Sequence, residues 1–231
     1  MCIHSLKALL FLFVGVMTGL QTAHSAQILA YTAPSGTRAV LLQGELVMGD
    51  EVELAKALEA APTAHLFLHS MGGSAIAGLR IRGVLKAHKK LRVFTSLEGA
   101  VCASACAIAA LGVDAERRYG QYQFHYPYIA GEEGDLRRED LPAGSDTRLY
   151  LALVDFAFTQ AFIEESTIDA QTIAKIRAAS TDGHHPIAWN LGKPLPKELA
   201  LAQVPKPTSD LGIEHEVVKT IKSEVEADLI N

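Results

Sequence analysis

The chain has 231 residues, of which 49% are hydrophobic and 20% are charged, and its formal net charge is −5. This length suits one domain with appendages, and the high apolar content excludes a mostly disordered chain. Because there is no excess of basic residues, electrostatic capture of nucleic acid is not expected. Three cysteines are too few for a scaffold built on disulfides.

The N-terminal segment has the pattern of a secretory signal peptide. Lys7 precedes a short apolar run, Ala8–Met17, and small and polar residues follow it. The run is shorter than the roughly 20 apolar residues that a membrane span needs, which disfavours an uncleaved anchor helix. We therefore predict a signal peptide over residues 1–26, and cleavage after Ser25 and after Ala26 both fit. The mature chain is expected to be periplasmic or secreted, with no stable membrane span.

Strand and helix patterns alternate behind this segment, and a charged stretch over 131–147 is expected to be a solvated loop. Strands separated by helices indicate an α/β fold with a largely parallel sheet, whose sites lie at the carboxyl ends of the strands. Asp50 is the expected N-cap of the first helix. In chain order we predict strands Gln27–Thr32 and Arg38–Leu46, helix Asp50–Ala60, strand Ala64–His69, helix Ala75–His88, strand Leu91–Thr95, helix Val101–Leu111, strand Arg117–His125 and helices Asp146–Ile163 and Asp169–Ala179.

Three segments at predicted strand ends carry residues suited to acyl transfer. Ser70-Met71-Gly72-Gly73-Ser74 joins a strand to a helix, where free backbone N–H groups bind a phosphate or an oxyanion. Cys102-Ala103-Ser104-Ala105-Cys106 places a serine among small residues, with the Ala105 N–H as a second donor. Phe124-His125-Tyr126-Pro127 puts a histidine at the end of a strand. Taken singly, such segments are more often plain turns, tightly packed helices or packed histidines.

In this order the three segments resemble the Clp protease proteolytic subunit family, within the wider Clp/crotonase superfamily. The resemblance is greatest to exported Clp-like proteins in which cysteines flank the serine. It covers residues 38–127 well and extends loosely to about residue 204. It implies a Clp/crotonase-like fold of repeated β-β-α units with a helical C-terminal segment. The expected domain spans residues 27–204, and residues 205–231 form a C-terminal tail.

The resemblance also implies a Ser-His-Asp peptidase site. Ser104 would be the nucleophile and His125 the general base, while the N–H groups of Gly73 and Ala105 would form the oxyanion hole. Asp182 matches the third member best, and Asn190 lies at an alternative register. The chemistry of the residues agrees, since a serine hydroxyl is a weak nucleophile until a neighbouring imidazole takes its proton.

Three functions fit these residues. The first is an exported serine peptidase, the second a catalytically degenerate Clp-like domain that binds peptides or acts as a scaffold, and the third a crotonase-like acyl-CoA enzyme. Export argues against the third, because free CoA thioesters are cytosolic, and the pair Ser104 and His125 favours the first over the second. The expected partners are a peptide or unfolded protein substrate and further copies of the chain in a homo-oligomer, with contacts through the apolar pattern over Tyr150–Phe162. No cofactor, metal ion or nucleic acid is expected.

The pairing of Cys102 and Cys106 stays open at the level of sequence. An oxidising compartment favours a disulfide, whereas the Cβ directions along a regular helix disfavour one between residues four apart. Pairing becomes easier if Cys102 lies before the helix. Two buried thiols are the alternative.

Overall fold

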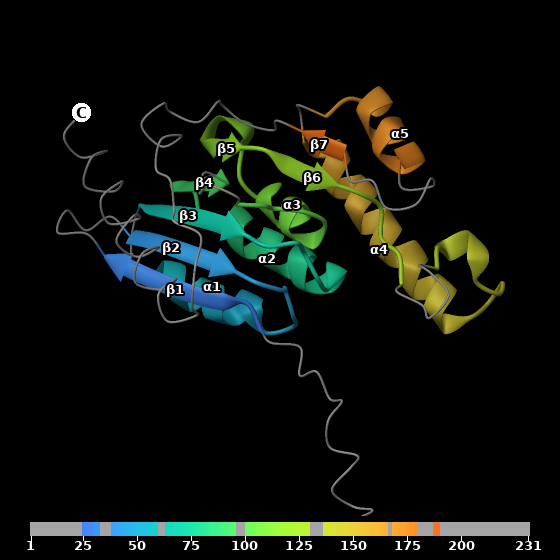
Figure 1. Cartoon of the computed structure of the whole chain (residues 1–231), viewed down its shortest axis with the longest axis horizontal. Coiled ribbons are helices and arrows are strands. Elements are labelled where there is room, and N and C mark those ends of the chain that lie inside the picture. The colour runs from blue at the N-terminus through green and yellow to red at the C-terminus, as the bar shows by residue number, and fades with distance from the viewer. Residues whose placement is uncertain are drawn as a thin grey trace, which may run out of the picture.

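A five-stranded, largely parallel sheet forms the centre of the fold (Figure 1). The computed structural model describes residues 25–32, 38–59, 63–95, 100–129, 136–165, 168–179 and 187–189. The strand order is β1-β2-β3-β4-β5, and only the pair of β1 (Gln27–Thr32) and β2 (Arg38–Gln43) is antiparallel. From β2 onward, β3 (Ala64–His69), β4 (Leu91–Thr95) and β5 (Arg118–Gly120) follow in parallel. The predicted α/β class with a largely parallel sheet is confirmed.

Both faces of this sheet are buried. On one face, alternate side chains of the central strands pack against α1 (Asp50–Glu59), α2 (Ala75–Ala87) and α3 (Ala105–Ala110) in the main core. On the other face, Phe67, Phe94 and Tyr119 stack in a row, with ring centroids about 5 Å apart. Burial on both faces explains why the central strands are continuous apolar runs rather than alternating ones.

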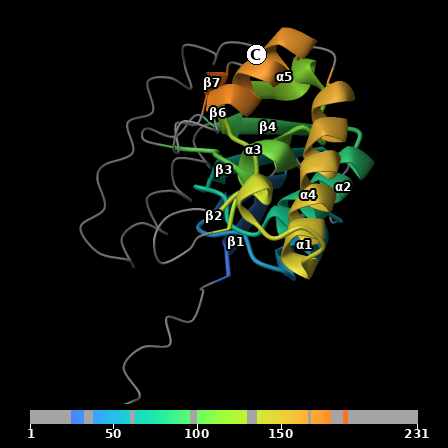
Figure 2. The same ribbon diagram turned by 90° about the vertical axis from the view of Figure 1, so that its right-hand side faces the viewer.

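The C-terminal part of the described chain packs beside the helical layer (Figure 2). It comprises β6 (Tyr122–Phe124), which pairs antiparallel with β7 (Ile187–Trp189), and two helices, α4 (Asp146–Ile163) and α5 (Ala170–Ala179). Phe162 of α4 meets Phe124 of β6 edge-on, with ring centroids 5.4 Å apart, and both belong to the main core. Two short 3-10 helices, Ala115–Arg117 and Arg138–Asp140, connect these elements.

Two predicted strands differ from the structure. β2 ends at Gln43 instead of Leu46, because Gly44 turns the chain with φ = +103°. The strand predicted over Arg117–His125 is divided into β5 and β6 after Gly120, which has φ = +95°. Such φ values suit glycine and interrupt a regular strand.

The predicted role of Asp50 is wrong. Asp50 is the first residue of α1, and its buried carboxylate does not cap that helix. One of its oxygens accepts hydrogen bonds from the backbone N–H groups of Val47 (2.7 Å) and Ala26 (3.3 Å). The carboxylate thus ties the start of β1 to the loop before α1.

Several predictions concern residues outside the described ranges. These are the signal peptide up to residue 24 and the C-terminal tail over 205–231. Within the described ranges, no helix combines the length and the hydropathy that crossing a bilayer requires.

Candidate active site

Ser104 occupies a sharp turn between an extended segment and α3. Its backbone has φ = 55° and ψ = −124°, and among the described residues it is the only non-glycine with a positive φ. A side chain in this region of the Ramachandran plot costs conformational energy, so the turn persists only if its neighbours hold it. The helix predicted from Val101 therefore begins only at Ala105, because residues 102 and 103 form isolated bridges to neighbouring strands.

Backbone hydrogen bonds hold this turn from both sides. On one side, the Ala103 N–H donates to the Ser70 carbonyl at 3.0 Å. On the other, the Ser104 N–H donates to the Gln123 carbonyl at 2.9 Å, and the Gln123 N–H donates to the Cys102 carbonyl at 2.9 Å. The segment before the serine thus extends the sheet between the ends of β3 and β6, and the serine stands where this pairing stops.

A disulfide brackets the serine. Cys102 and Cys106 are bonded, with their Cα atoms 5.2 Å apart, and both residues are fully buried. The geometry works because Cys102 lies in the extended segment and Cys106 in the first turn of α3. This resolves the alternative that the sequence left open in favour of a cross-link around Ser104.

Gly72 and Gly73 bring a second loop against the same turn. A Cβ atom on Gly72 would lie 2.6 Å from the Ser104 Cβ and 3.1 Å from the Ala105 nitrogen, so only glycine allows this approach. Within the described part of the chain, neither the Gly73 N–H nor the Ala105 N–H donates a hydrogen bond. Such donors, in loops that meet at a serine, are suited to binding a developing oxyanion.

His125 follows β6, the strand that pairs with the segment before Ser104. Ala103 of this segment forms a parallel bridge with Gln123, which lies two residues before His125. The bridge thus brings the end of β6, which His125 follows, beside the segment that carries Ser104. Both residues are partly exposed and accessible to a substrate.

A backbone contact determines the tautomer of His125. Its Nδ1 lies 2.8 Å from the Tyr126 carbonyl oxygen, which only accepts hydrogen bonds. Nδ1 therefore carries the proton, and in the neutral ring Nε2 is left with its lone pair. This is the tautomer that a general base acting through Nε2 requires.

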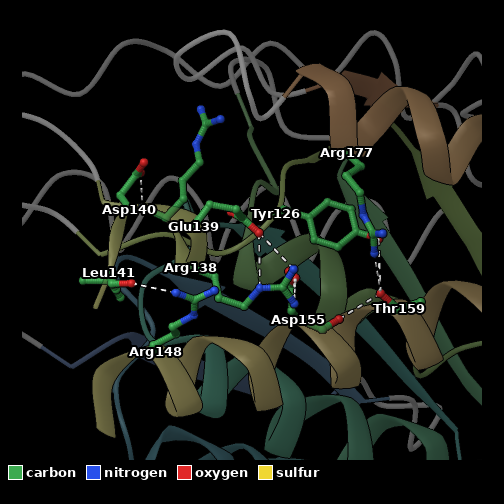
Figure 3. Close-up of polar contacts among 10 residues, drawn as sticks. Tyr126, Arg138, Glu139, Asp140, Leu141, Arg148, Asp155, Thr159 and Arg177 are labelled. Carbon is green, nitrogen blue, oxygen red and sulfur yellow. Dashed lines mark hydrogen bonds and ion pairs between the residues drawn. The ribbon is translucent and has the colours of Figure 1, made fainter. Parts of the chain in front are cut away.

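The chain just after His125 is anchored on α4 and α5 (Figure 3). The guanidinium of Arg177 lies over the Tyr126 ring, 4.7 Å from its centroid, and one of its nitrogens lies 3.3 Å from the Tyr126 hydroxyl. Thr159 of α4 completes the cluster, with its hydroxyl 3.3 Å from both the Tyr126 hydroxyl and Arg177. Because Tyr126 is fixed in this way, its carbonyl holds the His125 ring in place.

The third member of the predicted triad is not located. Asp182 and its alternative Asn190 lie outside the described residues. Two other aspartates have separate roles: Asp169 accepts the Thr172 N–H at the start of α5, and Asp155 of α4 forms an ion pair with Arg138. Burial raises the pKa of Asp155, although Arg138 and Arg177 oppose this.

Sequence reasoning missed two residues near the glycine pair. Glu45 follows β2, and its Cγ lies 2.8 Å from where a Cβ on Gly73 would be. His69 ends β3, and its Nδ1 accepts the Val101 N–H at 3.3 Å. Burial lowers the pKa of His69, which favours its neutral form. Their positions at the carboxyl ends of parallel strands were the available signal.

Comparisons with known proteins add little to this geometry. No protein-family model matches the sequence, and no curated protein is significantly similar to it. The structure is similar to that of a point mutant of ClpP1 from Listeria monocytogenes. The TM-score is 0.48 and the sequence identity 20%, over 66% of this chain and 82% of that one. We draw no functional inference from a similarity of this level.

Proposed function

We propose that this chain is an exported serine endopeptidase of the Clp-like kind that cleaves peptides or unfolded segments. The observation that carries the proposal is the Ser104 turn, which is strained, bracketed by a disulfide and packed against the glycine loop. Within the described residues, the N–H groups of Gly73 and Ala105 donate no hydrogen bond. A turn that serves only packing has no need of a serine in a costly backbone conformation. No cofactor or metal ion takes part in the proposed reaction.

The reaction follows the chemistry of the placed groups. His125 Nε2 takes the proton from the Ser104 hydroxyl as its oxygen attacks the peptide carbonyl. The N–H groups of Gly73 and Ala105 receive the negative charge on the tetrahedral oxygen. His125 then protonates the departing amine, and a water molecule hydrolyses the acyl-enzyme by the same steps. Asp182 would stabilise the imidazolium, with Asn190 as the alternative.

Export and self-association are parts of the same proposal. A disulfide at the reactive serine is favoured in an oxidising compartment such as the periplasm or the cell exterior. Self-association is suggested by α4, whose outer surface carries large apolar side chains exposed to between 39% and 64%, namely Leu149, Tyr150, Leu153, Phe156 and Ile163. A contiguous apolar stripe of this kind is typical of a surface that another protein covers.

The test is labelling of the purified oxidised protein with a fluorophosphonate probe, together with cleavage of a fluorogenic peptide library. We expect one labelled residue, Ser104, and no labelling or cleavage in the Ser104→Ala variant. His125→Ala should reduce both by several orders of magnitude, and the double variant should be no worse, because the two residues act as one unit. Asp182→Asn should lower the rate strongly, and an effect of Asn190→Ala alone would move the third role to Asn190.

A second serine provides a control variant that distinguishes loss of folding from loss of catalysis. Ser145 caps α4, where its hydroxyl accepts the Arg148 N–H at 3.2 Å. Ser145→Ala should cost stability, by about 1 kcal/mol, yet leave labelling intact. Cleavage that survives Ser104→Ala would overturn the peptidase proposal and favour the non-catalytic peptide-binding alternative.

A further inference from the structure

A cavity lies beside the glycine loop, on the side of the proposed oxyanion hole. Its volume is about 440 Å³, within the range of ligand pockets. The described residues of its walls are Gln43–Glu45 at the end of β2, His69–Gly73 at the end of β3, and Val101. Gly72 and Gly73 form part of the wall, and Gly72 also contacts the Ser104 turn. A side chain in this cavity would therefore lie next to the carbonyl that Ser104 attacks.

The described residues that line the cavity combine apolar surface with one acidic side chain. Met71 and Val101 supply apolar surface, and Met71 is 71% exposed, so it stands at the rim. Among the described residues of the wall, Glu45 is the only one with an acidic side chain. His69 accepts the Val101 N–H, and burial lowers its pKa, which favours the neutral form. Long basic side chains have a matching composition, with an apolar stem and a cationic head.

The position of Glu45 also bears on the reaction itself. Its side chain packs directly against Gly73, whose N–H is one of the two proposed oxyanion donors. A carboxylate at this place repels the negative charge that develops on the tetrahedral oxygen. A lysine or arginine side chain in the cavity would neutralise the carboxylate and remove that repulsion. The substrate's own charge would then lower the barrier as well as strengthen binding.

We propose that Glu45 is a specificity-determining residue and that the cavity takes a lysine or arginine side chain flanking the bond to be cleaved. This inference rests on the proposed peptidase function and names its substrate class. Glu45 does not touch the reacting atoms. Its effect therefore appears in the ratio of the kcat/KM values for different substrates.

The experiment compares peptides that are identical except for lysine, arginine, methionine or glutamate at each position flanking the scissile bond. At one position we expect kcat/KM for lysine and arginine to exceed that for methionine by about tenfold or more, with glutamate the poorest. Glu45→Gln should lower the rate on the basic peptides and raise it on the methionine peptide, so that the ratio falls towards one. Glu45→Lys should reverse the order and favour the glutamate peptide.

The control is Glu53→Gln, which removes an exposed carboxylate paired with Lys56 on α1, outside the cavity wall. It should leave the ratio between the peptides unchanged. The inference is overturned if Glu45→Gln does not alter the ratio of kcat/KM between basic and methionine peptides, or if the wild-type enzyme prefers methionine. In either case, labelling of Ser104 would still support the peptidase proposal.

Binding supplies a readout that does not need turnover. The lysine peptide should bind the Ser104→Ala variant more tightly than the methionine peptide, and adding Glu45→Gln should abolish the difference. Absence of Ser104 labelling together with this charge-dependent binding would sink the peptidase proposal but support the cavity as a site for basic side chains. Equal binding of all four peptides would overturn the cavity assignment as well.

Discussion

Glu164 and Glu165 are neighbours in the chain, yet their carboxylates lie in opposite environments. The Glu164 side chain is 47% exposed and pairs with Arg82 and Lys86 of α2. Glu165 is buried and forms an ion pair with Arg118, which is fully buried. Within the described residues, the Arg118 Nε and Nη1 atoms have no hydrogen-bond partner, so Glu165 is the group that offsets its charge.

Substitution of these two glutamates should have very different effects on stability. Glu165→Gln leaves the Arg118 charge buried without a counter-ion, and the expected loss in the free energy of unfolding is about 3 to 5 kcal/mol. Glu164→Gln is the matched control, because an exposed pair contributes no more than about 1 kcal/mol. Urea denaturation at pH 7 measures both variants. Equal losses would contradict the buried-charge argument.

The effect of Glu164→Gln should also depend on pH. Hydrogen bonds from Lys86 and Arg82 lower the pKa of Glu164 from 4.5 to about 2. A lowered pKa means that the folded state favours the ionised carboxylate, so its stabilising effect is full above pH 4.5 and disappears as the pH falls towards 2. The difference between wild type and Glu164→Gln should therefore vanish over that interval.

At the scale of single residues, the sequence predicted the site residues that belong to a motif with a particular backbone conformation. Ser104, Gly73, Ala105 and His125 were predicted as a group, and the structure brings the loops that carry them together. Glu45 and Arg118 were not predicted. A lone acidic residue after a strand and an arginine within one have no local signature, because the neighbours that give them meaning come from distant segments.

The turn around Ser104 shows the same limit at the scale of an element. The run of small residues from Val101 to Leu111 is compatible with a helix throughout, and the sequence predicted one. The structure keeps residues 102 and 103 extended, because they pair with Ser70 and Gln123 and because the disulfide joins this segment to α3. The two bridges join segments far apart in the chain, and helical periodicity does not report such contacts.

Removal of the disulfide should loosen this turn. The Cys102→Ser/Cys106→Ser variant is expected to lose about 2 kcal/mol of unfolding free energy, the value expected for closure of a short loop. Its labelling by a fluorophosphonate should slow, because the strained Ser104 conformation then relies on backbone hydrogen bonds alone. Urea denaturation and the labelling rate measure the two effects.

Reductant provides the control for this variant. Dithiothreitol should slow the labelling of the wild type once the disulfide is reduced, and it should have no further effect on the double-serine variant. Unchanged labelling of Ser104 in the reduced protein would mean that the turn is held without the cross-link.

At the scale of the whole molecule, the strands from β1 to β4 and the order of the helices followed from the sequence, while β7, the division between β5 and β6 and one surface did not. Patterns typical of strands and of helices alternate along the chain, and they predicted the strands of the main sheet and the helices between them. The α4 pattern is apolar on almost every side, and sequence alone did not distinguish the core-facing residues from the others. In the structure Leu151, Val154 and Phe158 face the core, whereas Leu149, Leu153 and Phe156 form an exposed stripe.

This exposed stripe on α4 predicts that the protein self-associates. Leu149, Leu153, Phe156 and Ile163 recur at intervals of three, four and seven residues, so they lie along one side of the helix and remain in water in the monomer. A second copy of the chain would bury them, and we expect a trimer or larger ring in sedimentation velocity runs at micromolar concentration. Leu153→Glu with Phe156→Glu should shift the protein to the monomer without unfolding it, since neither side chain belongs to the core. Ala174→Glu adds a charge to an exposed position of α5 and should leave the assembly intact. A wild-type monomer under these conditions, or an assembly that survives both substitutions on α4, would rule out this surface as the interface.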